Sequence, residues 1–215
     1  VGSYGRGQHK SAALAGSLVS DTRLRIASLL HCPARPAVFT PSATIALNIV
    51  IAGVIEKGVA NVYISPFEHN AVTRTLHHFE QKGKIKVCQL TVNEDMTYNR
   101  EKIRYQFDEC KPDLLIMSHV SNVIGLISPV EDIFSIAKKY SAVTVADLSQ
   151  SAGLIDFDAG KEYVDFAVFA GHKTLLGPTG ISGFIMKPDI KLPTMLFGGT
   201  GFESANQDMP SSIPE

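Results

Sequence analysis

The stretch Val143–Lys173, VTVADLSQSAGLIDFDAGKEYVDFAVFAGHK, decides how this chain folds. It begins with a β-branched run that ends in Asp147, and it closes with the apolar run Phe166–Ala170 followed by Gly-His-Lys. Both runs have the length and composition of buried strands bounded by turn residues. In α/β sheets, ligands bind at the edge where such strands end. The stretch therefore predicts a site with a carboxylate, an imidazole and an amine at one sheet edge.

Outward from this stretch, the chain alternates between apolar runs of strand length and segments with helical spacing. We expect strands at 38–40, 61–65, 85–90, 114–117, 143–147, 166–170 and 183–186, and helices at 11–30, 45–56, 68–81, 100–110 and 129–140. This interleaving predicts an α/β fold, a three-layer sandwich around a mostly parallel seven-stranded sheet. No repeat or internal linker interrupts it, so residues 1–215 are expected to form one domain.

The composition of the chain excludes several classes of protein. The chain has 215 residues, a net charge of −1 and 45% hydrophobic residues, which suits one large soluble domain. The near-neutral charge gives no case for nucleic acid or an anionic membrane as a partner. The longest apolar stretch, 45–55, is too short to span a bilayer, and no secretory signal is visible. Cys32, Cys88 and Cys110 are widely spaced, so we expect no metal site, no disulfide framework and a cytoplasmic protein.

Asp147 and Lys173 together suit one chemistry. Pyridoxal 5'-phosphate (PLP) is held on a lysine as a Schiff base, and a carboxylate keeps its ring nitrogen protonated. The ordinary alternatives are that Asp147 caps a turn and that Lys173 is a solvated loop residue. The pattern Asp147-x-x-Gln150 followed by Gly171-His172-Lys173 resembles the class V aminotransferase and cysteine desulfurase family of PLP enzymes. The resemblance implies the large domain of a fold type I PLP-dependent transferase.

The segment 40–44, TPSAT, offers a place for the cofactor's phosphate. Small residues between a strand end and a helix start leave backbone N–H groups free, and the helix N-terminus adds partial positive charge. The same pattern is also an ordinary helix cap. The segment 43–48, ATIALN, resembles the family's phosphate cup, commonly written ATEALN, with Ile45 in place of Glu. The resemblance implies that the Ala43 backbone and Thr44 hold the phosphate.

Two further motifs match the family. The segment 68–70, EHN, resembles a motif whose histidine stacks on the cofactor ring and shuttles protons, which implies this role for His69. The segment 121–125, SNVIG, resembles one whose asparagine lies near the cofactor's phenolate oxygen and the substrate carboxylate, which implies this place for Asn122. Without the resemblance, the first would be a cap histidine and the second a turn asparagine.

The two ends of the chain also resemble the family. The segment 4–9, YGRGQH, is similar to the family's PGRGxH, and 198–201, GGTG, to a segment that reaches the partner's cofactor phosphate across a dimer interface. Thr200 is therefore an expected cofactor ligand, and a homodimer is expected. Because the chain begins with Val1 and stops at Glu215, we expect the true N-terminal start and the small C-terminal domain to be missing. In the family that domain carries the substrate-binding arginine and, in desulfurases, the reactive cysteine.

The resemblance implies a role for each remaining residue. Lys173 would carry the cofactor and act as base or acid at the substrate's Cα, which makes it catalytic together with Asp147 and His69. Gln150 would bind the cofactor's phenolate oxygen, and His172 would bind its phosphate. One departure stands at Ala170, where the family has Ser or Thr in contact with the phosphate. The loss of that charge-assisted hydrogen bond costs roughly 1.5–3 kcal/mol if nothing replaces it.

Three functions are compatible with these residues. The first is a cysteine desulfurase, which converts L-cysteine to L-alanine and enzyme-bound sulfur for an acceptor protein, or a selenocysteine lyase. The second is a class V aminotransferase or lyase that acts on another amino acid. The third is a dimeric scaffold that binds PLP without turnover. Which bond at the substrate's Cα or Cβ breaks depends on groups that the sequence does not identify.

Overall fold

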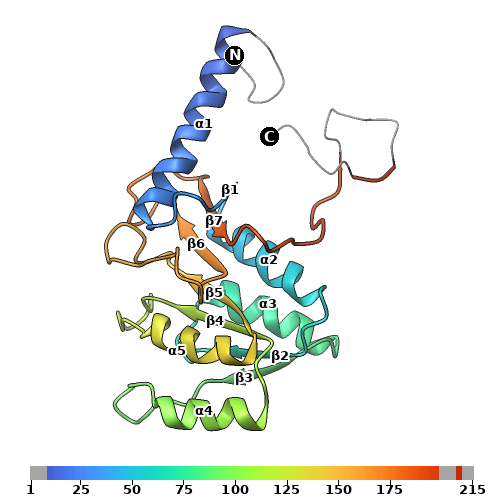
Figure 1. The fold of residues 1–215 in the computed structure, drawn as a ribbon, viewed down its shortest axis with the longest axis vertical. Helices are drawn as coiled ribbons and strands as arrows, with labels where there is room; N and C mark the ends of the chain where they lie inside the picture. Colours follow the sequence, from blue (N-terminus) through green and yellow to red (C-terminus); the bar gives the residue numbers. More distant parts are fainter. Residues whose placement is uncertain (1–8, 199–206, 210–215) are drawn as a thin grey trace.

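A seven-stranded sheet with helices on both faces forms the body of the molecule (Figure 1). The computed structural model describes residues 9–198 and 207–209. Its strands are β1 (Ala37–Thr40), β2 (Asn61–Ile64), β3 (Lys86–Gln89), β4 (Leu114–Ser118), β5 (Val143–Asp147), β6 (Phe166–Ala170) and β7 (Ser182–Met186). All seven strands expected from the sequence are present, so the α/β prediction is confirmed.

The strand order is β1-β7-β6-β5-β4-β2-β3. Neighbouring strands from β3 to β6 run parallel, and β7 runs antiparallel to both β6 and β1, so the sheet is mostly parallel as predicted. Because β4, β5 and β6 run in one direction, they end at the same edge. In the β4–β5 register Ser118 lies opposite Asp147, which places both side chains on one face of the sheet.

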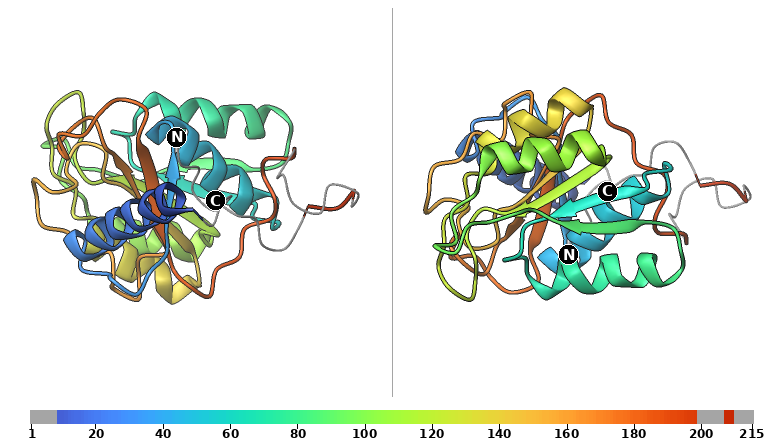
Figure 2. Two further views of the ribbon diagram at one scale, coloured as in Figure 1. Left: turned by 90° about the horizontal axis from the view of Figure 1, so that it is seen from above. Right: turned by 90° about the horizontal axis from the view of Figure 1, so that it is seen from below.

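Helices cover both faces of the sheet, as the two end views show (Figure 2). They are α1 (Lys10–Leu29), α2 (Ala43–Ile55), α3 (Asn70–Gln81), α4 (Arg100–Glu109) and α5 (Val130–Ala137), with a 3₁₀ turn at Lys138–Tyr140. One apolar cluster packs α2 and α3 on the sheet around Ile51 and Val72, and another packs α4 and α5 around Phe107 and Phe134. The sheet lies between these two clusters, so the fold has three layers: helices, sheet and helices.

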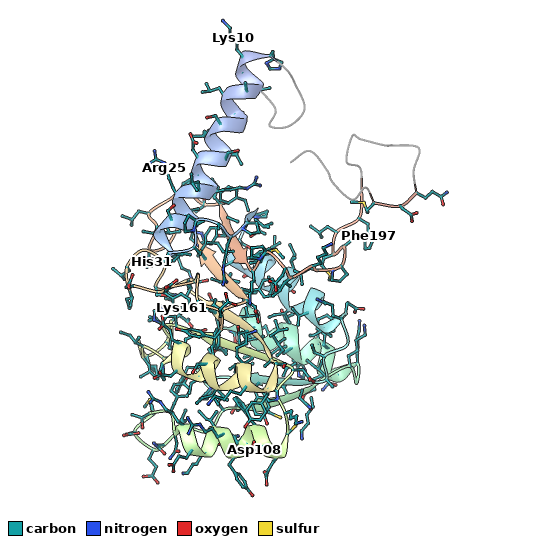
Figure 3. All side chains as sticks on the ribbon, viewed as in Figure 1. Lys10, Arg25, His31, Asp108, Lys161 and Phe197 are labelled. Carbon is teal, nitrogen blue, oxygen red and sulfur yellow. The ribbon has the colours of Figure 1, made fainter. Side chains whose placement is uncertain are left out.

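Helix α1 differs from the others because most of its length stands away from the body, with Lys10 at its far end (Figure 3). Ala27, near its C-terminal end, is buried in the core, whereas Leu14 and Leu18 are exposed. In the described part of the chain, no helix combines the length and apolarity needed to cross a bilayer.

Two helix starts differ from the sequence expectation, and both lie at the site. Helix α2 begins at Ala43 rather than at residue 45, because the Ser42 hydroxyl accepts a hydrogen bond from the N–H of Ile45 at 3.2 Å and caps the helix. Helix α3 begins at Asn70 rather than at residue 68, with His69 as its cap. Glu68 therefore belongs to the loop that precedes α3.

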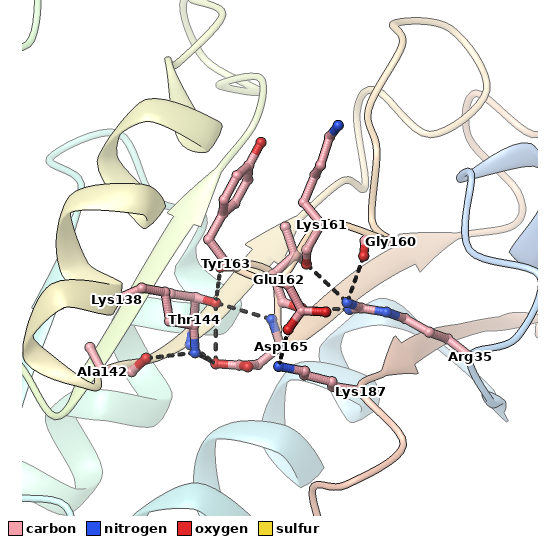
Figure 4. A network of polar contacts seen from close by, with 11 residues as sticks. Arg35, Lys138, Ala142, Thr144, Gly160, Lys161, Glu162, Tyr163, Asp165 and Lys187 are labelled. Carbon is pink, nitrogen blue, oxygen red and sulfur yellow. Dashed lines mark hydrogen bonds and ion pairs between the residues drawn. The ribbon is translucent and has the colours of Figure 1, made fainter.

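A polar network lies at the opposite edge of the sheet, where β5 and β6 begin (Figure 4). Oδ2 of Asp165 pairs with the Lys138 ammonium group and accepts the N–H of Thr144 at 2.8 Å. Arg35 donates to the carbonyls of Gly160 at 3.0 Å and Lys161 at 2.9 Å. The Asp165 contacts join the segments before β5 and β6, and the Arg35 contacts join the segment before β1 to the one before β6. Side chains of the protein itself therefore occupy this edge of the sheet.

Candidate active site

The ends of β4, β5 and β6 and the starts of α2 and α3 border a cavity of about 230 Å³. Thr200, an expected cofactor ligand, lies outside the described residues. The other site residues expected from the sequence all line this cavity: Ala43, Thr44, His69, Asn122, Asp147, Gln150, His172 and Lys173. The structure thus brings together residues from five separate segments of the chain.

Asp147 is the last residue of β5 and is 4% exposed. Its Oδ1 accepts the N–H of Ser149 at 2.9 Å, so the ordinary interpretation as a turn cap holds for this one oxygen. Among the described residues, no donor reaches its Oδ2. Because Asp147 lines the cavity, this free oxygen is suited to pair with a cationic group there.

The turn after β6 carries Lys173 and depends on Gly171. The N–H of Gly171 donates to the carbonyl of Ile181 at 3.0 Å, and a Cβ at Gly171 would lie 2.3 Å from the same oxygen. Only glycine therefore fits against β7 at this point. The N–H of Gly177 donates back to the Gly171 carbonyl at 2.7 Å, which closes the turn. Among the described residues, Lys173 Nζ has no hydrogen bond or ion-pair partner.

The first turn of α2 leaves two amide groups unused. Ser42 takes the N–H of Ile45 through its hydroxyl and the N–H of Ala46 through its carbonyl, the latter at 3.0 Å. The N–H groups of Ala43 and Thr44 have no intrahelical acceptor, because the first residues of a helix have no carbonyl one turn before them. Together with the helix dipole, they form an anion site at the wall of the cavity.

His69 combines two roles that the sequence presented as alternatives. Its Nδ1 accepts the N–H of Ala71 at 3.0 Å and caps α3, while the residue also lines the cavity. Because Nδ1 is an acceptor, the neutral ring carries its proton on Nε2. The cap thus fixes both the position of the imidazole and its tautomer.

Sequence reasoning gave no role to Glu68, which the structure connects to the site. Its Oε1 accepts the N–H of Ser118 at 2.7 Å, and its Oε2 accepts the Ser118 hydroxyl at 2.8 Å. Burial raises the pKa of Glu68 to about 7, against the opposing effect of hydrogen bonds from Ser65 and Ser118. The only signal in the sequence was its place beside His69, since its partner Ser118 is fifty residues away along the chain.

Ala170 lines the cavity and supplies no hydroxyl there. Its partner in the β6–β7 register is Ser182, whose buried hydroxyl has no hydrogen-bond partner among the described residues. The phosphate contact expected from a Ser or Thr at position 170 is thus absent. The unpaired hydroxyl opposite position 170 is that of Ser182, on the neighbouring strand β7.

None of the three cysteines lines the cavity. Burial raises the pKa of the Cys32 thiol to about 11, so this thiol stays protonated and unreactive at neutral pH. Within the described ranges, no group of three His, Cys, Asp or Glu residues could hold a metal ion. The chemistry of the cavity therefore rests on Lys173, Asp147 and their neighbours.

The fold and the cavity define a class of protein. A parallel sheet with an unpaired lysine after one strand, an aspartate at the end of the next and an anion site at a helix start is suited to a phosphorylated, carbonyl-bearing cofactor. The comparison with known proteins agrees with this class. The chain belongs to the aminotransferase class-V family, whose model matches residues 1–211.

Individual relatives in this family carry related names. The chain is 30% identical over 212 residues to the cysteine desulfurase IscS of Dechloromonas aromatica (strain RCB), covering 91% of this chain and 50% of that protein. It is 33% identical over 199 residues to IscS of Glaesserella parasuis serovar 5 (strain SH0165), covering 89% and 48%. The chain thus spans about half the length of the curated relatives that it matches.

Solved structures give the same picture. A NifS-like protein superposes with a TM-score of 0.83 at 26% identity, covering 92% of this chain and 55% of that one. The structure described as SspA in complex with cysteine gives a TM-score of 0.81 at 26% identity, covering 92% and 58%. The chain therefore shares its fold with somewhat more than half of each of these structures.

Proposed function

We propose that this chain is the PLP-binding part of a cysteine desulfurase. The observation that carries the proposal is the single cavity that Lys173, Asp147 and the free amides of α2 share. Relatives at about 30% identity are named cysteine desulfurases, which supports cysteine as the substrate. We propose further that residues 1–215 form the large domain of a longer protein.

The residues fit the cofactor group by group. PLP supplies an electron sink that stabilises negative charge at the substrate's Cα. Asp147 has one oxygen without a donor for the protonated ring nitrogen, and Lys173 has an amine without a partner for the aldehyde carbon. The amides of Ala43 and Thr44, with His172, provide hydrogen bonds for the phosphate.

The protein residues would then orient the substrate and move protons. Lys173 Nζ is the group that takes and returns a proton at Cα, because it is the amine that the site leaves unpaired. His69 would stack on the ring, and its capped Nδ1 leaves Nε2–H as the donor. Gln150 and Asn122 line the same cavity and would donate to the ring oxygen and the substrate carboxylate.

The thiol that receives sulfur is a separate part of this proposal. No cysteine of the chain lines the cavity, and Cys32 is held protonated by burial. We therefore assign the sulfur-accepting cysteine and the substrate-binding arginine to another part of the full protein. A homodimer in which Thr200 contacts the partner's cofactor, a sulfur acceptor protein and a cytoplasmic location with free thiols complete the proposal.

Reduction with borohydride tests the cofactor. It should fix PLP on Lys173 of the full protein, and mass spectrometry should find the adduct there. Lys173→Ala should lose the adduct, while Lys161→Ala, which changes an exposed lysine, should keep it. An adduct on another lysine, or none, would refute the proposed site.

Product analysis then tests the reaction. With L-cysteine, the full protein should form alanine and sulfide in equal amounts under reducing conditions. Transfer of the amino group to a keto acid without sulfide would instead identify an aminotransferase. PLP binding without turnover of any amino acid would identify the scaffold.

A further inference from the structure

Glu68 joins the segment that carries His69 to the end of β4. One carboxylate oxygen accepts the N–H of Ser118 at 2.7 Å and the other accepts its hydroxyl at 2.8 Å, so the two residues form a two-point contact. The Ser65 hydroxyl donates to the same carboxylate from the end of β2. Because His69 follows Glu68 directly, this contact sets where the imidazole enters the cavity.

A second carboxyl group so close to Asp147 is electrostatically unfavourable. Ser118 lies opposite Asp147 in the β4–β5 register, and both residues line the cavity. Burial raises the pKa of Glu68 to about 7, and the charge of Asp147 contributes to the increase. Near neutral pH, Glu68 is therefore protonated in roughly half of the molecules while the cavity holds no cation.

We propose that Glu68 is a positioning residue, which clamps the His69 segment onto β4 and releases its proton when a cation pairs with Asp147. The inference rests on the proposed function, because a pyridinium ring supplies that cation. Once Asp147 is neutralised by an N–H⁺ donor, its repulsion of a Glu68 carboxylate weakens. The proton then leaves Glu68 for solvent, and the Ser118 hydroxyl donates to the carboxylate as the structure shows.

Other titratable groups lie near Glu68, but none of them takes the place of Asp147 as the charge that controls release of the Glu68 proton. Tyr98 lies in the loop after β3, and burial, with a smaller contribution from the charge of Glu68, raises the pKa of its phenol, so Tyr98 stays neutral near pH 7. His69 follows Glu68 with its Nδ1 used in the cap. Lys173 and His172 line the cavity from the turn after β6. A ligand with an aldehyde would react with the amine of Lys173, whereas a ligand without an aldehyde leaves this amine chemically unchanged.

Pyridoxine 5'-phosphate is such a ligand, because it carries the ring and the phosphate but no aldehyde. We would measure its binding to the cofactor-free full protein at pH 7 by calorimetry in buffers of different ionisation enthalpy, which counts the protons released. Glu68→Gln keeps the shape of the side chain and removes its charge. Glu94→Gln changes an exposed glutamate and is the matched control.

The wild type and Glu94→Gln should release measurably more protons per site than Glu68→Gln, since Glu68 is partly protonated at that pH and its pKa falls when Asp147 is paired. Equal proton counts in all three proteins, with binding intact, would overturn the linkage and leave the proposed function standing. Absence of binding in all three would refute both together. The carboxyl ¹³C signal of Glu68 in the unmodified protein gives an independent measurement: its titration midpoint near 7 should fall when the ligand is bound.

The positioning role of the Glu68–Ser118 contact is measured separately, by the visible circular dichroism of bound PLP, which reports how the ring is held. In Glu68→Gln the amide can still accept the Ser118 N–H and donate to its hydroxyl, so the signal should persist. In Glu68→Ala both contacts are lost, and the signal should fall at least twofold in PLP-saturated protein. An unchanged signal in Glu68→Ala would show that the contact with Ser118 does not position the site.

Discussion

Two buried aspartates at opposite edges of the same sheet have different surroundings. Asp165 precedes β6 and is 3% exposed, and Asp147 ends β5 and is 4% exposed. Oδ2 of Asp165 receives the Lys138 ammonium and two donors of Thr144, whereas Asp147 receives one backbone N–H on Oδ1. Burial alone therefore does not mark a functional carboxylate in this protein. What distinguishes Asp147 is a carboxylate oxygen that receives no hydrogen bond from the described residues.

The largest effect should come from Asp147→Ala. If its free oxygen pairs with the cofactor's ring nitrogen, turnover of cysteine should fall by at least ~10²-fold, because a buried charge-assisted partner is lost. The free energy of unfolding should fall by about 1.5 kcal/mol, since one hydrogen bond from a backbone N–H to the carboxylate is removed. Steady-state kinetics and urea unfolding measure the two quantities. Near-normal turnover would mean that Asp147 is only a turn cap.

Asp165→Asn should show the reverse pattern. The variant leaves the partly buried Lys138 without its anionic partner, which should lower the free energy of unfolding by about 2–3 kcal/mol. PLP content per folded molecule should be unchanged, because the network lies at the other edge of the sheet. Asp156→Asn, in an exposed pair with His31, is the control and should cost less than about 0.5 kcal/mol. A loss of cofactor in folded Asp165→Asn would contradict the separation of the two edges.

Glu68 should make stability depend on pH in the cofactor-free protein. Its folded pKa of about 7 lies above the ordinary 4.5, so the folded protein holds more protons than the unfolded chain between these values. The stabilising contribution is therefore complete below pH 4.5 and is lost as pH rises through 7. Between pH 4.5 and 8, the wild type should lose about 3 kcal/mol more than Glu68→Gln. Chemical unfolding across this range tests the sign, and parallel curves for the two proteins would disprove it.

The smallest expected effect concerns an unpaired hydroxyl. Ser182 is fully buried next to Ala170, and its hydroxyl has no partner within the described residues. Ser182→Ala should raise the free energy of unfolding by about 0.5–1 kcal/mol, because a buried donor without a partner is costly. If Ser182→Ala instead weakens PLP binding severalfold, the hydroxyl serves the phosphate that Ala170 cannot contact.

The sequence predicted the sheet and the cavity residues because both depend on local patterns. Apolar runs at strand length gave all seven strands, and short motifs gave residues such as Asp147 and Lys173, which the structure then places in one cavity. The start of α3 was predicted two residues too early, because the imidazole of His69, rather than Glu68, supplies the cap.

The remaining features depend on contacts between distant segments. Glu68 meets Ser118 only after β2 and β4 pair, and Asp165 meets Lys138 only after β5 is in place. No spacing within one segment reveals such a contact. The hydrogen-bond partners of Asp165 likewise come from distant segments, so the residue type alone could not show how the two buried aspartates differ.

The position of β1 in the sheet has a consequence for biosynthesis. This strand is made early, yet among the described strands its neighbour in the sheet is β7, which leaves the ribosome after β2 to β6. Strands β2 to β6 can pair as they emerge, whereas β1 waits for a partner from residues 182–186. Because only Pro41 and Ser42 separate β1 from α2, the anion site at Ala43 and Thr44 takes its final place only then. The nascent chain should thus become able to hold a phosphate group at the last step of sheet assembly.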